Sequence, residues 1–272
     1  MQKQMTIIKP KSGWQLIDWK ELREYRDLFF FLVWRDIKAR YAQSVLGVGW
    51  AIIQPVFSMI VFTIVFGNLA KIDSDGAPYA IFSFAALVPW TFFSNALINS
   101  SGSLAQNMIT KIYFPRLIMP LAAVLSKSVD FFISLFILVG LLFWFQVLPT
   151  IWIIILPYLI ILLMLTAVGF GMWLSALAVQ FRDIRYGLNF GVQLLMYAAP
   201  VVYPASLIPE QYRLFYALNP MVGVIEGFRS AILATNPMPW DLISIGTISA
   251  AVIAFSGALY FKKREKFFAD VI

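Results

Sequence analysis

The chain contains no cysteine and no histidine among its 272 residues, and only 13% of its residues are charged. Without cysteine it cannot form a disulfide, a thiolate metal site or a thiol nucleophile. Without histidine it lacks an imidazole general base and the commonest metal-ligating side chain. A soluble chain usually keeps about a quarter of its residues charged, so the low charge content indicates a membrane protein.

Long apolar runs make up most of the sequence, which is 61% hydrophobic. A helix needs roughly 20 apolar residues to cross the hydrocarbon core. Six candidate spans follow, at 45–70, 79–99, 117–147, 151–179, 188–202 and 242–261. We therefore predict an all-α polytopic membrane protein with a cytoplasmic N-terminal region (1–44), a six-span domain (45–261) and a basic cytoplasmic tail (262–272).

The basic residues predict the orientation of these spans. Six crossings put both termini on one side, and the segments expected on that side hold 18 of the 21 Lys and Arg residues. Cytoplasmic loops carry such an excess of Lys and Arg, so both termini are expected in the cytoplasm. The same distribution explains the net charge of +7 without nucleic acid as a partner.

Two segments outside the spans have helical character. Residues 19–41 are charged but carry Leu22, Tyr25, Phe29, Leu32 and Val33 near helical spacing, which predicts an amphipathic helix in the membrane interface. The alternative is a partly buried cytosolic helix. Residues 203–240 contain five prolines and a short apolar stretch at 221–233, and we expect re-entrant or interfacial helices there on the outer side.

One charged pair falls inside the third apolar run. Lys127 and Asp130 are three residues apart, share a helix face and could pair at the inner membrane boundary. An ion-coupling site within the membrane is the alternative, and it would make the chain a secondary transporter. Outside the spans, Asp73 and Asp75 are expected in a solvated turn.

Motifs for nucleotide or metal chemistry are missing. The sequence has no Walker phosphate-binding loop and no acidic constellation that would support a metal-dependent glycosyltransferase. We therefore expect no cofactor and no metal in this chain. G-x-x-x-G occurs at Gly187 to Gly191 and at Gly223 to Gly227, which is weak evidence for close helix contact.

Four segments resemble the signatures of polysaccharide-exporting ABC transporter permeases. They are 34–41 (WRDIKARY) with 44–47 (SVLG), Trp50 and Gln54-Pro55; 109–117 (ITKIYFPRL) with Pro120; 181–184 (FRDI); and Asn219-Pro220 with Glu226 and Arg229. The matches occur in order over nearly the whole chain and are similar to the O-antigen branch. Ala42-Gln43 departs from the pattern, since many relatives carry a basic residue after the tyrosine.

The resemblance implies a homodimer of this chain docked on two copies of a separate ATPase subunit, which binds ATP and Mg. Residues 103–113 would form the coupling helix, with Asn107, Met108, Thr110 and Lys111 as its contacts. A second cytoplasmic contact would use Arg182, Asp183 and Arg185. Aromatic faces can stack on sugar rings, although ordinary helix packing is the alternative. The candidates for a channel lining are Trp50, Phe57, Trp90, Phe93, Tyr197 and Tyr203.

We expect this chain to carry out transport and to catalyse no covalent reaction itself. The chain is expected to be the inner-membrane subunit of an ABC exporter for lipid-linked surface polysaccharide, with O antigen as the first candidate. Teichoic acid or a smaller lipid or drug is the alternative cargo.

Overall fold

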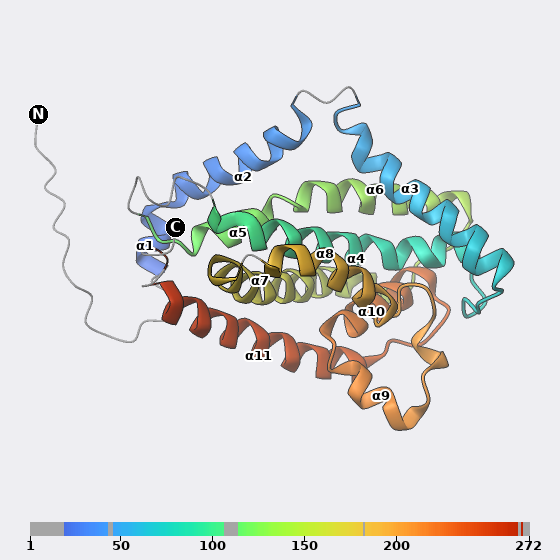
Figure 1. Ribbon diagram of the computed structural model, residues 1–272. Helices are drawn as coiled ribbons and strands as arrows, with labels where there is room; N and C mark the ends of the chain where they lie inside the picture. The colour runs from blue at the N-terminus through green and yellow to red at the C-terminus, as the bar shows by residue number, and fades with distance from the viewer. Residues whose placement is uncertain (1–18, 43–45, 106–113, 182, 266–267, 269–272) are drawn as a thin grey trace, which may run out of the picture.

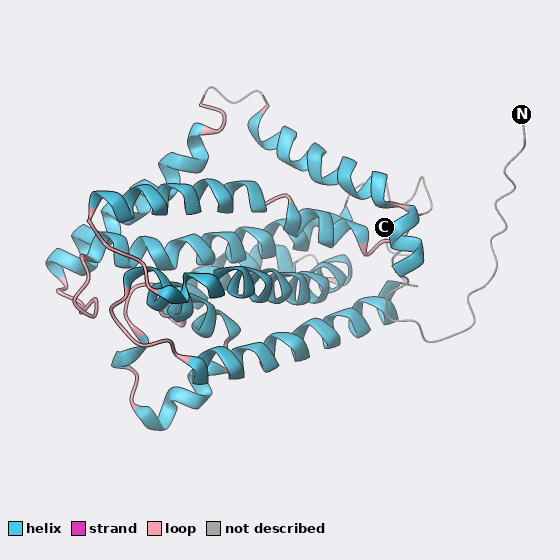
Figure 2. Ribbon diagram, turned by 180° about the vertical axis from the view of Figure 1, so that it is seen from behind, coloured by secondary structure: helices cyan, strands magenta, loops and turns pink. Residues whose placement is uncertain are grey.

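The computed structural model describes residues 19–42, 46–105, 114–181, 183–265 and 268 (Figure 1). Every regular element in these ranges is helical, as Figure 2 also shows. The elements are α1 (Trp19–Glu24), α2 (Arg26–Tyr41), α3 (Gly49–Phe62), the π-helix η1 (Thr63–Leu69), α4 (Tyr79–Gly102), η2 (Ser103–Ala105), α5 (Ile118–Leu125), α6 (Ser128–Trp144), η3 (Ile151–Ile155), α7 (Leu156–Gln180), α8 (Asp183–Tyr197), η4 (Ala205–Leu207), α9 (Glu210–Ala217), α10 (Pro220–Leu233) and α11 (Trp240–Arg264).

Five helical stretches in the described ranges are long and apolar enough to cross a membrane. They are Gly49–Leu69, Tyr79–Gly102, Ile118–Trp144, Ile151–Gln180 and Trp240–Arg264. Each corresponds to a span predicted from the sequence. The chain is therefore a multi-pass, all-helical membrane protein.

The fifth predicted span, 188–202, differs from the others. Its helix, α8, has 15 residues and ends at Tyr197. At 1.5 Å per residue it is about 22 Å long, which is shorter than the ~30 Å hydrocarbon core. The residues that follow form turns instead of continuing the helix. A crossing at this position would need these turns in addition to α8.

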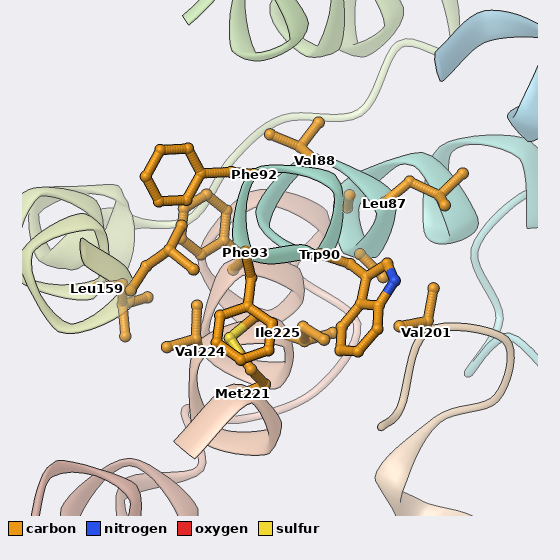
Figure 3. Packing of buried hydrophobic residues seen from close by; sticks show 14 of the residues in the cluster. Leu87, Val88, Trp90, Phe92, Phe93, Leu159, Val201, Met221, Val224 and Ile225 are labelled. Atoms are coloured by element: carbon orange, nitrogen blue, oxygen red, sulfur yellow. The ribbon is translucent and has the colours of Figure 1, made fainter. Parts of the chain in front are cut away.

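Helix α4 lies at the centre of the bundle. Of its most apolar 18-residue window, 78% is buried, because α3, α5, α6, α7, α8 and α10 all pack against it. Figure 3 shows Trp90 and Phe93 of α4 pointing toward Met221, Val224 and Ile225 of α10. These side chains belong to the largest buried cluster.

Helices α2 and α3 form an arch that rises from the rest of the bundle (Figure 1). Only 6% of the most apolar 18-residue window in Gly49–Leu69, the stretch formed by α3 and η1, is buried within the chain. Large side chains such as Phe57 and Val61 are 63% and 49% exposed. The arch therefore presents apolar surface to lipid or to another protein.

The third span is interrupted near its start. Helix α5 ends at Leu125, α6 begins at Ser128, and a turn at Ser126 and Lys127 separates them. The Asn99 side-chain amide of α4 donates to the Ala123 carbonyl (3.0 Å) and to the Ser126 hydroxyl (3.3 Å). These bonds satisfy polar groups that the interruption leaves without helical partners.

Helix α10 covers the whole apolar stretch predicted at 221–233. The Asn219 side chain caps its first turn by accepting from the Met221 amide (3.1 Å), and Pro220 stands at its first position. The helix ends at Leu233 and is followed by Ala234, which has a left-handed φ of 61°. All residues of α10 are buried within the chain, so it is a core helix that is too short to cross a bilayer.

Candidate functional site

The end of α2 is attached to the start of α6. The Arg40 guanidinium forms an ion pair with one oxygen of Asp130, and the Tyr41 hydroxyl donates to the other oxygen. Burial, together with this hydrogen bond, raises the pKa of Tyr41 to about 12. Tyr41 therefore remains a neutral donor, and Asp130 holds the N-terminal helix against the membrane domain.

The predicted pair between Lys127 and Asp130 is wrong. In the described residues, the ion pair of Asp130 is with Arg40 of α2 and not with Lys127. The physical reason is the turn at Ser126 and Lys127, which places Lys127 before the first turn of α6. Lys127 instead lines a small cleft between α4 and α6, together with Asp130 and Asn95.

The apolar face predicted for 19–41 packs on the protein itself. Leu32 is buried, and Leu22, Tyr25, Phe29 and Val33 join it in a cluster with α5, α7 and the end of α11. The opposite face carries exposed aromatic side chains, at Phe30 (62%), Phe31 (57%) and Trp34 (64%). If this helix lies in the membrane interface, these three side chains face the lipid.

Most of the predicted ATPase contacts lie outside the described residues. These are Asn107, Met108, Thr110, Lys111 and Arg182. Asp183 is exposed at the first position of α8, and Arg185, at the third position, is partly exposed. Close to the predicted coupling helix, Arg116 donates to the Glu265 carbonyl (2.7 Å) and lies over the Phe268 ring. Arg116 therefore joins the start of the third span to the end of α11.

The six aromatic candidates for a channel lining do not share one surface. Trp50 (48% exposed) and Phe57 (63%) lie on α3, and Tyr197 (55%) ends α8. Tyr203 is partly buried, and its hydroxyl donates to the Tyr197 carbonyl (2.9 Å).

The remaining two candidates, Trp90 (4% exposed) and Phe93 (3%), lie in the core of this chain. Their assignment to a lining is therefore corrected: in this conformation they pack α4 against α10 (Figure 3). The sequence did not reveal this, because a tryptophan in an apolar run has the same pattern whether it faces a channel or a neighbouring helix.

A buried ion pair organises the segment that follows α8. Arg229 and Glu226 of α10 are 3% and 8% exposed, and Arg229 donates to a Glu226 oxygen at 2.9 Å. Arg229 also donates to the carbonyls of Val201 (2.8 Å) and Tyr203 (3.2 Å). The Ala205 amide donates to Glu226 at 3.3 Å.

Further contacts hold the same segment from other sides. The Tyr79 hydroxyl of α4 donates to the Val202 carbonyl (2.6 Å), and the Tyr216 hydroxyl of α9 contacts that of Tyr203 (3.2 Å). Residues 201–205 thus lie at the junction of α4, α9 and α10. The sequence singled out Glu226 and Arg229 as a family signature, but their partners are distant in the chain and were not predicted.

Asp75 lies in a turn and is partly exposed, as the sequence predicted, but it also has partners that are distant in the chain. Its two carboxylate oxygens accept from the Ser206 hydroxyl (2.9 Å) and from the Asn236 amide (2.6 Å). It therefore links three connecting segments at one end of the molecule, after η1, at η4 and after α10. Asp73 is exposed, as predicted, and one of its carboxylate oxygens accepts a hydrogen bond from the Asp75 backbone amide.

The two G-x-x-x-G segments have different surroundings. A Cβ added at Gly223 would lie 2.6 Å from the Leu242 carbonyl, and one at Gly227 would lie 2.9 Å from Leu159. Gly187 and Gly191 of α8 have nothing within 4 Å of such an atom. Only the second segment mediates close helix contact within this chain.

The comparison with known families agrees with this architecture. Residues 27–233, which begin in the first turn of α2 and end with α10, match the ABC-2 type transporter family. The chain belongs to this family. ABC-2 type transporters are membrane permeases, and membership implies a partnership with a nucleotide-binding subunit.

Several relatives of this ABC-2 permease are named for carbohydrate export. The O-antigen export system permease protein RfbA of Myxococcus xanthus is 28% identical over 91% of this chain and 96% of its own length. A protein of the same name from Klebsiella pneumoniae is 26% identical over 90% and 95%. The polysialic acid transport protein KpsM of Escherichia coli is 22% identical over 85% and 91%.

The described part of this permease contains no group of three or more Asp, Glu, His or Cys side chains that could hold a metal ion. Its relatives are transport permeases and not enzymes.

Proposed function

We propose that this chain is the membrane subunit of an ATP-driven exporter of lipid-linked surface polysaccharide, with O antigen as the favoured cargo. The observation that carries the proposal is the match to O-antigen export permeases over about nine tenths of both chains. The polysialic acid transporter among the relatives supports the same class of cargo. ATP and Mg would be bound by a separate ATPase subunit, two copies of which would serve two copies of this chain.

A homodimer would explain the exposed apolar surfaces. The stretch formed by α3 and η1 buries only 6% of its most apolar window, and α8 exposes Tyr186 (81%), Phe190 (65%) and Leu194 (53%). A second copy could cover part of these faces and leave a channel between the two chains. Trp50, Phe57, Tyr197 and Tyr203 remain candidates for its aromatic lining, and Trp90 and Phe93 would support that wall from behind.

The proposed topology has six crossings and cytoplasmic termini in the inner membrane. It requires α8, with the turns after it, to serve as the fifth crossing, because Arg182 and Arg185 then lie on the basic side and Arg213 on the other. The 203–240 region, including α9 and α10, would then form the outer gate. Residues 1–44 with the interface helix and the tail at 262–272 would stay cytoplasmic.

Coupling to the ATPase is assigned to two cytoplasmic segments. The first is 103–113, with Asn107, Met108, Thr110 and Lys111, and the second is the turn with Arg182, Asp183 and Arg185. Phe114 is buried just after the first segment, and Arg116 contacts the end of α11. Movement of this segment would therefore be transmitted directly to two membrane helices.

The decisive experiment uses a strain in which this gene is deleted. Lipid-linked glycans are isolated, and their membrane side is assayed with an impermeant glycan-binding probe. We expect polymer to accumulate on the cytoplasmic face and to be absent from the cell surface. Normal surface polymer in a strain without a duplicate gene would contradict the proposal. An ion-coupled carrier would, in contrast, transport without any ATPase subunit.

A further inference from the structure

Helix α9 turns its polar and small side chains toward the rest of the chain. The Arg213 guanidinium lies 3.1 Å from a carboxylate oxygen of Asp241 in α11, and the Tyr216 hydroxyl contacts that of Tyr203 (3.2 Å). Ala217 is fully buried. The face of α9 that meets the protein is therefore not its most apolar face.

The opposite face of α9 is apolar and exposed. Leu214, Phe215 and Leu218 are 64%, 73% and 57% exposed. Leu218 continues the last helical turn, so these residues and Gln211 follow the i, i+3, i+4, i+7 spacing of one stripe. A stripe of this kind is normally turned toward an apolar medium, and the rest of the chain does not cover it.

Tryptophans mark a membrane boundary beside α9. Trp144 ends α6, Trp152 lies in η3 at the start of the fourth predicted span, and Trp240 begins α11. The rings of Trp152 and Trp240 meet edge to face, with centroids 5.4 Å apart. Tryptophan is enriched where a membrane meets water. Asp241, the partner of Arg213, directly follows Trp240, so α9 lies at the level of this boundary.

Helix α9 is attached to the side of α11 that faces away from the bundle. Asp241, Ile248 and Val252 are at positions i, i+7 and i+11 and therefore lie on one face of α11. Ile248 and Val252 are 66% and 61% exposed within a membrane-spanning helix. The ion pair with Asp241 thus places α9 on a face of α11 that is in contact with lipid further along the helix.

The length of α9 fits a position in the membrane interface. Its eight residues span about 12 Å, which is far less than the ~30 Å hydrocarbon core. An amphipathic helix with Leu and Phe on one face binds in the plane of the interface, with that face among the ends of the acyl chains.

A second copy of this chain is the alternative cover for the stripe. The surfaces assigned above to the proposed dimer lie on the α3–η1 stretch and on α8. In both ribbon views, α9 lies at the edge of the bundle opposite the α2–α3 arch (Figures 1 and 2). A partner placed on α3 would therefore leave α9 uncovered, and its position favours lipid as the occupant.

We propose that α9 is seated in the lipid interface, with Leu214, Phe215 and Leu218 inserted among the acyl chains. The choice of the outer leaflet rests on the proposed function and its topology, whereas the contact with lipid does not. The sequence predicted re-entrant or interfacial helices for 203–240 without assigning a face. The proposal separates the two: α10 is a core helix, and α9 carries the stripe that binds lipid.

The absence of cysteine allows a direct test with single labels. Phe215→Cys and Leu218→Cys each receive a nitroxide spin label in the full-length chain, which is reconstituted in vesicles of phosphatidylethanolamine and phosphatidylglycerol. Collisions of the label with oxygen, which concentrates in hydrocarbon, are compared with collisions with nickel ethylenediaminediacetate, which stays in water. Val252→Cys on α11 is the lipid control, and Asp73→Cys at an exposed loop position is the aqueous control.

We expect oxygen to relax the labels at positions 215 and 218 more strongly than the nickel complex does, as at position 252. The order should be reversed at position 73. Labels at 215 and 218 that respond like the label at 73 would show that the stripe lies in water, which would overturn the proposal. Labels that neither reagent reaches would show a protein cover, such as a second copy, and would overturn it equally.

The leaflet and the proposed function are tested separately. Asp73→Cys, at the end of the molecule that carries α9, is expected to react with a membrane-impermeant maleimide in intact spheroplasts. Reaction only after permeabilisation would overturn the outer leaflet. Normal surface polymer in the deletion strain would remove the proposed function and leave the oxygen preference at 215 and 218 unchanged. Water-exposed labels in a chain that still exports polymer would remove the lipid contact alone.

Discussion

The guanidinium carbon of Arg229 lies 3.6 Å from the centroid of the Phe82 ring, so α10 and α4 meet through a buried cation. The same guanidinium is paired with Glu226 and donates to the backbone of the segment after α8. A buried charge is tolerated when its hydrogen bonds are complete and its partner is present. This contact therefore fixes the 201–205 segment, which the proposed function places at the outer gate.

Arg229→Met is expected to destabilise the detergent-solubilised chain by about 3–5 kcal/mol, because it leaves Glu226 buried without its partner. The measurement is thermal unfolding of the purified protein. Arg213→Met is the matched control, since Arg213 forms an exposed pair with Asp241, with 42% and 49% of the two side chains exposed. An exposed pair contributes about 1 kcal/mol or less. Equal unfolding temperatures for the two variants would contradict a stabilising role for the buried pair.

Asp130→Asn is expected to loosen α2, because it removes the negative charge that pairs with Arg40. Amide hydrogen exchange in α2 should accelerate about tenfold, as expected for the loss of one charge-assisted contact. Asp27→Asn serves as the control, since Asp27 at the other end of α2 forms an exposed pair with Arg26. Exchange that is unchanged in Asp130→Asn would show that the apolar face of α2 holds the helix without this tether.

Gly257→Ala tests the crossing of α7 and α11. An added Cβ would lie 2.5 Å from the Gly169 carbonyl and 3.0 Å from the Trp173 ring, so the two helices would have to separate. Overpacking of this kind costs typically about 1–3 kcal/mol. Gly140→Ala on α6 meets nothing within 4 Å and should be neutral or slightly stabilising. If both variants unfold at the same temperature, the close approach of α7 and α11 is not required for stability.

Trp50→Ala and Trp90→Ala should separate a channel role from a packing role. Trp50 is 48% exposed, whereas Trp90 is 4% exposed and fills the core beside α10. Trp90→Ala is expected to lower the unfolding free energy by about 3–5 kcal/mol. Trp50→Ala should leave unfolding nearly unchanged and reduce export of polymer at equal protein level. Normal export in Trp50→Ala would remove Trp50 from the proposed lining.

The sequence predicted the elements that depend on local composition. Apolar runs of 20 residues or more identified the five long membrane helices, because a helix in lipid satisfies its own backbone polar groups. The run at 188–202 was shorter, and there the structure contains a helix that ends at Tyr197. Length alone therefore could not establish that span.

Pairing between distant segments could not be predicted in the same way. Lys127 and Asp130 share a helical spacing, yet Asp130 pairs with Arg40, which lies 90 positions earlier in the chain. The partners of Arg229 include the carbonyl of Phe82, which lies 147 positions earlier. Spacing within one helix identified the charged residues, but the packing of other helices decided their partners. A charged pair in an apolar stretch is nevertheless a signal of an organised polar site.

Lys111→Glu tests the proposed coupling to the ATPase. The substitution would place a negative charge in the segment expected to dock on the ATPase subunit, and like-charge or unpaired contacts weaken such docking. We expect surface polymer to fall strongly while this chain remains in the membrane at its normal level. Co-purification of the ATPase subunit and export of polymer are measured together. Lys71→Glu, at an exposed position expected on the opposite side, is the control and should preserve both. Normal export and normal ATPase association in Lys111→Glu would refute the assignment of 103–113 as the coupling helix, whereas loss of export with retained association would place its role after docking.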